Sequence, residues 1–133
     1  MNNRKYNSTN PNQGSAKKVL CVCSAGLLRS PTLAYVLGTK GLNTRAAGST
    51  ATFALIIADD VLIHWADEIV FVNKENYEEL SRTHHADLIG KSIKILQIPD
   101  MYEYRHPQLE LICDDQYWNT HPFIYSQDET ANP

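Results

Sequence analysis

The sequence predicts an α/β protein with a single domain, built from a four-stranded parallel sheet and helices on both faces. Two observations lead to this expectation. Apolar runs typical of buried strands alternate along the chain with segments of helical spacing. The chain has 133 residues, the usual size of one domain, and 43% of them are hydrophobic, which is enough to fill one core.

The first strand and the first helix are separated by a short loop. Lys18–Cys23 is mostly apolar and bounded by polar residues, a pattern typical of a strand buried on both faces of a parallel sheet. Ser24-Ala25-Gly26 indicates a loop. Ser30-Pro31 then offers an N-cap residue followed by proline at the first helical position, and apolar residues continue with helical spacing as far as Gly38. These residues predict a strand, a tight loop and a helix.

The remaining elements follow the same alternation. We expect strands at 43–47, 67–73 and 92–98, and helices at 54–66, at 75–84 and from about residue 106 onward. Residues 1–16 are rich in polar residues, glycine and proline, which predicts a disordered tail. The folded domain is then 17–118, and 119–133 is a polar extension that is at best partly ordered.

Composition and charge exclude several classes of partner. The formal net charge is −3, so no basic footprint favours a nucleic acid or an anionic membrane. No apolar run approaches the length of a membrane span or a signal peptide. The cysteines number three, and we expect Cys21 and Cys23 to point to opposite faces of their strand. A disulfide scaffold is therefore not expected, and the protein is predicted to be cytoplasmic.

The motif that carries chemistry is Cys23 and Arg29, separated by five residues between a strand and a helix. A segment of that length can wrap into a semicircle whose backbone N–H groups point inward, and the following helix adds its positive end. Arg29 can close this anion cradle with a bidentate guanidinium. The same positive surroundings favour the thiolate form of Cys23, which would then be a nucleophile facing a bound phosphate.

The sequence resembles the low-molecular-weight protein tyrosine phosphatases, and more closely a family of shorter predicted tyrosine phosphatases of that fold. The resemblance implies a flavodoxin-like strand order 2-1-3-4 with the CX5R phosphate loop after the first strand. The matching stretches lie in order across about residues 17–113, and they are Lys18–Thr32, Thr44–Ser49, Trp65–Val72 and Ile98–Leu109.

The resemblance also assigns roles to individual residues. Cys23 is the nucleophile, Arg29 the phosphate clamp, Ser30 the hydroxyl that assists the thiolate as leaving group, and Asp100 the general acid. Ser49 is implied to buttress the phosphate loop. The backbone of that loop is expected to bind phosphate through Ser24, Ala25, Gly26, Leu27, Leu28 and Arg29.

The chemistry of the reaction also favours Asp100 as the general acid, independently of the resemblance. Phosphate ester cleavage requires a proton on the departing oxygen, and a carboxylic acid opposite the nucleophile can supply it. Functional loops of an open parallel sheet lie beyond the carboxyl ends of the strands, where Asp100 can face the loop after Cys23. Tyr102 and Tyr104 follow closely, either as walls for an aromatic substrate or as helix-flanking aromatics.

Departures from the larger family affect the loop and the acid. Ala25-Gly26 stands where a glycine and a left-handed asparagine are usual, so we expect the serine and histidine network around that asparagine to be missing. Met101 replaces the proline that usually follows the acid. Leu28 replaces a second loop cysteine, so Cys23 is expected to be less protected against overoxidation.

The combined expectation is a phosphomonoester hydrolase, directed at phosphotyrosine and acting through a phosphocysteine on Cys23. It requires no metal and no cofactor. Its partner is a phosphorylated protein or a small phosphomonoester, and the protein is expected to be a monomer. The alternatives are a catalytically weak phosphate- or phosphotyrosine-binding module, an arsenate reductase, and a phosphocysteine carrier.

Overall fold

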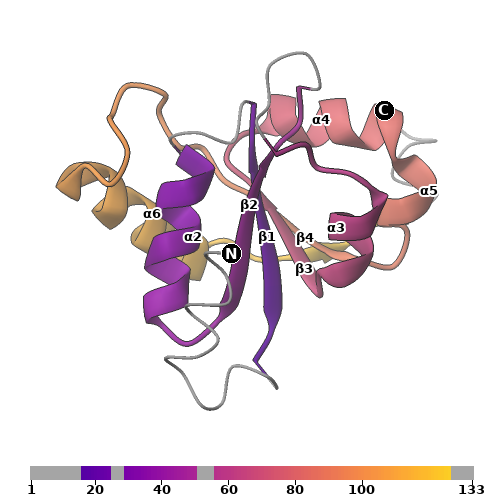
Figure 1. The fold of residues 1–133 in the computed structure, drawn as a ribbon, viewed down its shortest axis with the longest axis horizontal. Coiled ribbons are helices and arrows are strands. Elements are labelled where there is room, and N and C mark those ends of the chain that lie inside the picture. Colours follow the sequence, from indigo (N-terminus) through magenta and orange to yellow (C-terminus); the bar gives the residue numbers. More distant parts are fainter. Residues whose placement is uncertain (1–15, 25–28, 51–55, 127–133) are drawn as a thin grey trace.

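The structure, a computed structural model, describes residues 16–24, 29–50 and 56–126. Its centre is one five-stranded sheet in the order β2-β1-β3-β4-β5 (Figure 1). The expected fold class and the order 2-1-3-4 are confirmed. A two-residue fifth strand, which pairs antiparallel with β4, was not predicted. The strands are β1 (Lys18–Cys23), β2 (Asn43–Gly48), β3 (Glu68–Phe71), β4 (Ser92–Ile95) and β5 (Phe123–Ile124).

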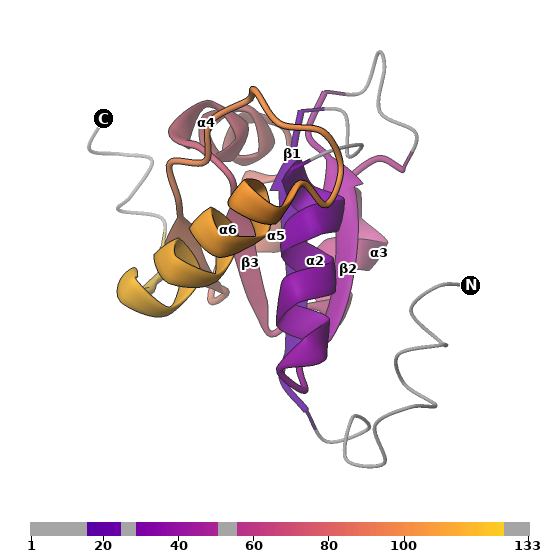
Figure 2. The same ribbon diagram turned by 90° about the vertical axis from the view of Figure 1, so that its left-hand side faces the viewer.

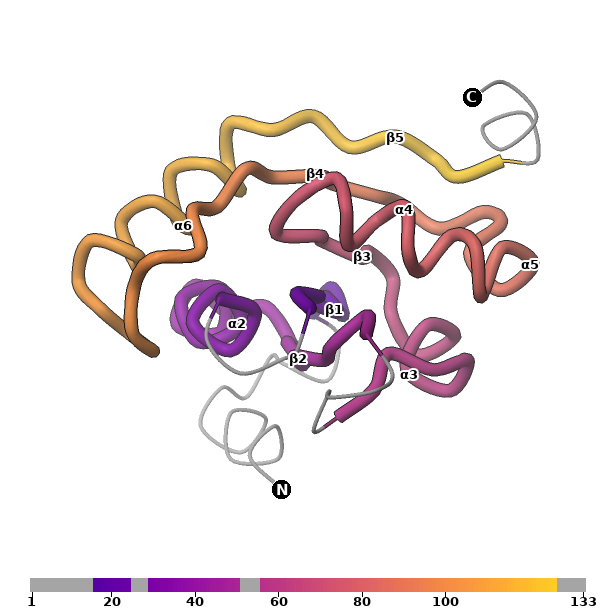
Figure 3. The backbone as a smooth tube through the Cα atoms, turned by 90° about the horizontal axis from the view of Figure 1, so that it is seen from above, coloured from indigo at the N-terminus to yellow at the C-terminus, as the bar shows by residue number. Residues whose placement is uncertain are grey.

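Helices cover both faces of the sheet, as Figures 2 and 3 show from the side and from above. One face carries α2 and α6, and the other carries α3, α4 and α5. Each face buries its own apolar layer, because alternate residues of the central strand β1 point to opposite sides. The helices are α2 (Arg29–Thr39), α3 (Asp60–Trp65), α4 (Lys74–Thr83), α5 (His85–Leu88) and α6 (Pro107–Asn119).

The expectation that Cys21 and Cys23 point to opposite faces of β1 is wrong. Both side chains belong to the apolar layer under α2 and α6, together with Val19, whereas Leu20 and Val22 belong to the other layer. The physical reason is the period of two in a strand, which places residues two positions apart on the same face.

The helix expected at 54–66 is shorter in the structure. Its first two positions lie outside the described residues, and Ile57 forms a bridge with Gly48 beside β2. The helix α3 begins at Asp60, because Asp59 is extended and its carboxylate accepts a hydrogen bond from the backbone N–H of Leu62 at 3.0 Å. The helix therefore begins at this cap and does not include the apolar residues that precede it.

The parallel register aligns the carboxyl ends of four strands at one edge of the sheet. Cys23 pairs with Gly48 at the ends of β1 and β2, and Phe71 pairs with Ile95 at the ends of β3 and β4. Backbone pairing continues past β4, where the N–H of Ile98 donates to the carbonyl of Val72. Loops that follow these strands therefore converge on one side of the molecule.

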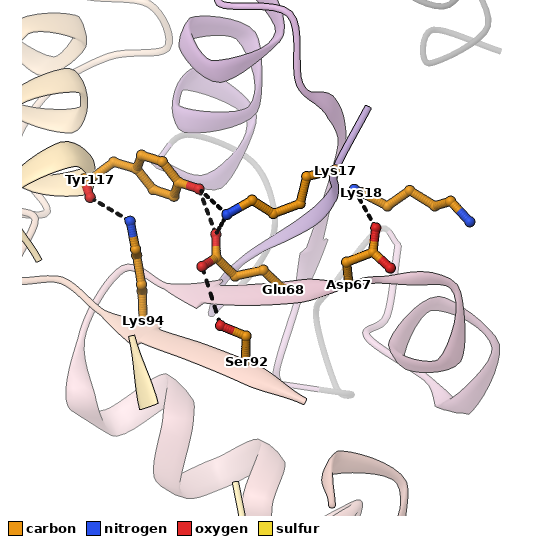
Figure 4. Close-up of polar contacts among 7 residues, drawn as sticks. All are labelled: Lys17, Lys18, Asp67, Glu68, Ser92, Lys94 and Tyr117. Carbon is orange, nitrogen blue, oxygen red and sulfur yellow. Dashed lines mark hydrogen bonds and ion pairs between the residues drawn. The ribbon is translucent and has the colours of Figure 1, made fainter. Parts of the chain in front are cut away.

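A buried charged cluster occupies the opposite, amino edge of the sheet (Figure 4). Glu68 is 1% exposed, and its carboxylate accepts a hydrogen bond from the Tyr117 hydroxyl and lies 3.4 Å from the Lys17 ammonium. Lys94 donates to the backbone carbonyl of Tyr117 at 2.8 Å and lies 3.6 Å from the centre of the same ring. These contacts tie α6 to β3, to β4 and to Lys17, the residue before β1.

Candidate functional site

Cys23 ends β1 at the carboxyl edge of the sheet and is almost fully buried, with 4% of its surface exposed. Its Sγ lies 3.1 Å from the hydroxyl of Ser30, which is in the first turn of α2. The Ser30 hydroxyl is also 3.3 Å from the carbonyl of Ala47 on β2. A hydroxyl so close to a thiolate can donate to the sulfur and stabilise its negative charge.

Arg29 is the first residue of α2, and its guanidinium lies at the same edge. It is 7% exposed, and its Nη1 donates to the carbonyl of Ile98 at 3.1 Å. Its Nε lies 3.6 Å from Oδ1 of Asp100. Among the described residues, no acceptor is within hydrogen-bond distance of its Nη2. Within that part of the chain, the site therefore contains a buried cation with donors still available to a ligand.

Asp100 reaches this edge from the segment that connects β4 to α6. Its side chain is 68% exposed, so its carboxylate is open to solvent while it contacts the Arg29 guanidinium. The structure thus brings together Cys23, Ser30, Arg29 and Asp100 from three separate parts of the chain. The chemical roles assigned to them from the sequence stay predictions.

Tyr102 and Tyr104 differ in their surroundings. Tyr102 packs in part against the apolar layer under α2 and α6, and its ring centre is 5.0 Å from that of His106. Tyr104 is 50% exposed. The packing of Tyr102 fits a helix-flanking aromatic, and the exposure of Tyr104 leaves it available to a substrate.

The expected phosphate loop is described only at its ends. Ser24 directly follows Cys23, and Arg29 begins α2, whereas the predicted phosphate-binding residues Ala25, Gly26, Leu27 and Leu28 lie outside the described residues. The Ser24 carbonyl accepts a hydrogen bond from the N–H of Thr50 at 3.0 Å, so the start of the loop is held by the chain that leaves β2.

Ser49, which the resemblance implied as a buttress of the phosphate loop, belongs to a side-chain network beside Ser24 whose other members were not predicted from the sequence. Asn76, in the first turn of α4, donates from Nδ2 to the hydroxyls of Ser24 at 3.0 Å and Ser49 at 3.2 Å. Ser49 and Thr50 in turn lie 2.8 and 2.9 Å from one carboxylate oxygen of Glu79. The spacing of Asn76 and Glu79, three positions apart on a helix, could have suggested a shared face but not its target.

The segment that carries Asp100 is anchored to α2 through Arg105, which sequence reasoning also missed. Arg105 has a φ of 60°, an uncommon value outside glycine, and its backbone N–H donates to the Thr32 hydroxyl at 2.9 Å. Its guanidinium lies 3.5 Å from the centre of the Tyr35 ring and pairs with Glu110 at 2.9 Å. These contacts fix one end of the segment between β4 and α6.

The other two thiols lie in the core on the α2 and α6 side. Burial raises the pKa of Cys21 well above its ordinary value, and Cys113 adds to the effect. Burial likewise raises the pKa of Cys113, to about 12, and the neighbouring carboxylates of Glu110 and Asp114 act in the same direction. Both thiols are therefore protonated at neutral pH and are poor nucleophiles.

The fold and this edge define a doubly wound α/β domain whose candidate site lies at the carboxyl ends of parallel strands, where such folds place their ligands. The solved structure of the YwlE arginine phosphatase from Geobacillus stearothermophilus is similar, with a TM-score of 0.56, 17% sequence identity, and coverage of 74% of this chain and 88% of that one. The likeness shows a shared fold.

Comparisons by sequence give no further relation. No model of a known protein family matches the chain, and a search of curated proteins finds no match. Within the described ranges, every helix is too short or too polar to span a lipid bilayer. The same residues contain no group of three His, Cys, Asp or Glu side chains placed to hold a metal ion.

Proposed function

We propose that this protein is a cysteine-dependent phosphomonoester hydrolase that acts on phosphotyrosine through a phosphocysteine intermediate. The observation that carries the proposal is the convergence of Cys23, Ser30, Arg29 and Asp100 at one edge of the sheet. A thiol, a hydroxyl donor, a buried guanidinium and an exposed carboxyl group are the parts that such a reaction needs.

In the first step, the Cys23 thiolate attacks phosphorus, a P–S bond forms and the P–O bond to the leaving group breaks. Asp100 gives its proton to the departing oxygen, so that a hydroxyl group leaves rather than an oxyanion. Arg29 holds the equatorial phosphate oxygens through its Nη2 donors, which have no acceptor among the described residues. The shared fold with an arginine phosphatase supports this reaction class.

In the second step, water attacks phosphorus and the P–S bond breaks. The Asp100 carboxylate takes the proton from water, and inorganic phosphate is released. Ser30 lies 3.1 Å from the sulfur, so its hydroxyl can donate to the thiolate as that group departs.

We also propose that the protein is located in the cytoplasm, where phosphotyrosine proteins and a reducing environment are found together. A second substrate class comes from the solved structure of similar fold, since that protein is an arginine phosphatase. In phosphoarginine the phosphorus is bonded to nitrogen rather than to oxygen, so the leaving group differs. The attacking thiolate of Cys23, the guanidinium of Arg29 and the phosphoryl group that is transferred are the same in both reactions.

The test is turnover of 4-nitrophenyl phosphate, a phosphotyrosine peptide and phosphoarginine by the purified protein. Cys23→Ser should abolish turnover, because a neutral hydroxyl is a far weaker nucleophile than a thiolate. Cys21→Ser serves as the matched control, since Cys21 is buried two positions earlier on the same face of β1. Full activity in Cys23→Ser would contradict the proposal.

Asp100→Ala tests the general acid separately. We expect it to lower kcat roughly 100-fold for a phosphotyrosine peptide, and less for 4-nitrophenyl phosphate, whose leaving group needs no proton. An equal loss with both substrates would assign Asp100 to binding rather than to proton transfer. A preference for phosphoarginine in the wild-type protein would replace phosphotyrosine as the substrate class.

A further inference from the structure

Asn76 is an almost fully buried polar side chain that the proposed reaction does not use. It is 1% exposed and lies in the first turn of α4, where its backbone N–H is already bonded to the side chain of the helix cap Asn73. Its amide reaches two hydroxyls at the carboxyl edge of the sheet, those of Ser24 and Ser49. Ser24 is the first residue after the proposed nucleophile.

The donor and the acceptor of each hydrogen bond in this network can be assigned by starting from Glu79. A carboxylate oxygen accepts hydrogen bonds, so the hydroxyl of Ser49 donates to Glu79 at 2.8 Å. The oxygen of Ser49 is then left to accept, and the atom of Asn76 that faces it must be the amide nitrogen. The glutamate therefore fixes the orientation of the asparagine amide.

The same amide nitrogen also donates to the hydroxyl oxygen of Ser24 at 3.0 Å. Because Ser24 accepts in this bond, its own hydroxyl proton is not used by Asn76 and remains available to another acceptor. The backbone of Ser24 is held independently, through the bond between its carbonyl and the N–H of Thr50. The hydroxyl is thus fixed both in position and in polarity.

The arrangement has a cost that a purely structural side chain would avoid. The Oδ1 atom of Asn76 is buried, and among the described residues it accepts no hydrogen bond. An unsatisfied buried acceptor destabilises the folded state, and an apolar residue of similar size would remove that cost. What the asparagine supplies in exchange is two donors directed at Ser49 and Ser24.

We infer that Asn76 is a positioning residue for phosphate binding, which orients the Ser24 hydroxyl as a donor beside Cys23. The inference rests on the proposed function, because the acceptor for the Ser24 proton is the bound phosphate. Asn76 acts through Ser24 and does not touch the substrate. Glu79 determines which group donates and which accepts in each hydrogen bond of this network.

The test is a double-mutant cycle between Asn76→Asp and Ser24→Ala. An aspartate has the shape of asparagine without its donors, so Ser24 would donate to the new carboxylate instead of to phosphate. We expect Asn76→Asp to weaken the binding of inorganic phosphate, measured by calorimetry, and to lower kcat/KM for 4-nitrophenyl phosphate, each about tenfold. In the Ser24→Ala background the same substitution should change either quantity less than about threefold.

Two further variants separate positioning from charge and from folding. Lys74→Gln changes the net charge of α4 by the same amount at an exposed position and should leave both quantities unchanged. Asn76→Ala removes the donors without adding a charge, so it should reproduce the loss and its dependence on Ser24 if Asn76→Asp does not fold. Thermal unfolding identifies variants that are folded.

The outcomes distinguish this inference from the proposed function. An active wild-type protein whose phosphate affinity is unchanged in Asn76→Asp and Asn76→Ala, or reduced equally with and without Ser24, overturns the inference alone. A wild-type protein that binds phosphate but hydrolyses no ester overturns the proposed function, and the cycle in phosphate affinity still decides the role of Asn76. A protein that does not bind phosphate overturns both.

Discussion

Both edges of the parallel sheet contain a charged side chain that is almost fully buried. At the amino edge, the carboxylate of Glu68 has three side-chain partners, which are Tyr117 on α6, Ser92 on β4 and Lys17 just before β1. At the carboxyl edge, Arg29 contacts one backbone carbonyl and one solvent-exposed carboxylate, and its Nη2 donors have no acceptor among the described residues. Burial of a charge is thus common to both edges, and the unused donors distinguish the candidate site.

The largest effect is expected from Arg29→Lys at the carboxyl edge. An ammonium cannot make the bidentate contacts of a guanidinium, so kcat/KM for an aryl phosphate should fall roughly 100- to 1000-fold. Stability in urea should change little. Arg45→Lys is the matched control, because Arg45 is partly buried on β2, over the Trp65 ring, away from the site. Equal losses in both variants would remove the distinction between the two arginines.

The next effect is expected at the amino edge, from Glu68→Ala. Loss of a buried carboxylate leaves the Tyr117 hydroxyl and the buried Lys94 without their anionic partner, so the free energy of unfolding should fall by about 3 kcal/mol. Turnover per folded molecule should stay the same. Glu78→Gln, at an exposed pair on α4, should change stability by less than about 0.5 kcal/mol. A large loss of turnover in Glu68→Ala would show that the edges are coupled.

The smallest effect concerns the core between the two edges and appears only at alkaline pH. The pKa of Cys113 is raised to about 12, whereas a thiol in the unfolded chain ionises near pH ~8.5. The folded state therefore holds its proton more tightly, and the stability due to this thiol is complete below about pH 8.5 and is lost as pH rises toward 12.

Urea unfolding of wild type and Cys113→Ala between pH 8 and pH 10 measures this loss. One such group gives a slope of at most about 1.4 kcal/mol per pH unit, so the wild-type curve should fall more steeply than that of the variant. Cys21 and Tyr117 also have raised pKa values, so part of the slope should remain in the variant. Parallel curves would contradict the assignment to Cys113.

Much of the fold could be predicted because its signals are local. The apolar run of β1 and the alternation of strands with helices identified a parallel sheet, and Ser30-Pro31 predicted a helix that in fact begins one residue earlier, at Arg29. Less could be predicted where the bounds or the existence of an element depend on a helix cap or on pairing between residues distant in sequence. The start of α3 depends on Asp59, and β5 exists only because Phe123 and Ile124 meet the edge of β4.

The candidate site divides in a similar way. Cys23, Ser30 and Arg29 are close in sequence, and their spacing predicts an anion site because it falls between a strand and the start of a helix. Contrary to the expectation, Cys21 lies on the same face of β1 as Cys23, because residues two positions apart in a strand point to the same side. Asn76 and Glu79 could not be recognised, because an asparagine and a glutamate in a charged helix are ordinarily solvated.

By itself, the sequence determined the class of the fold, the order of its elements and the candidate nucleophile and clamp, because periodicity, capping and short spacing act between neighbours along the chain. Tertiary structure alone decided which distant side chains meet: Asp100 beside Arg29, Asn76 beside Ser24, and Glu68 beside Tyr117. Those meetings depend on strand register and helix placement, which are set by packing over the whole core.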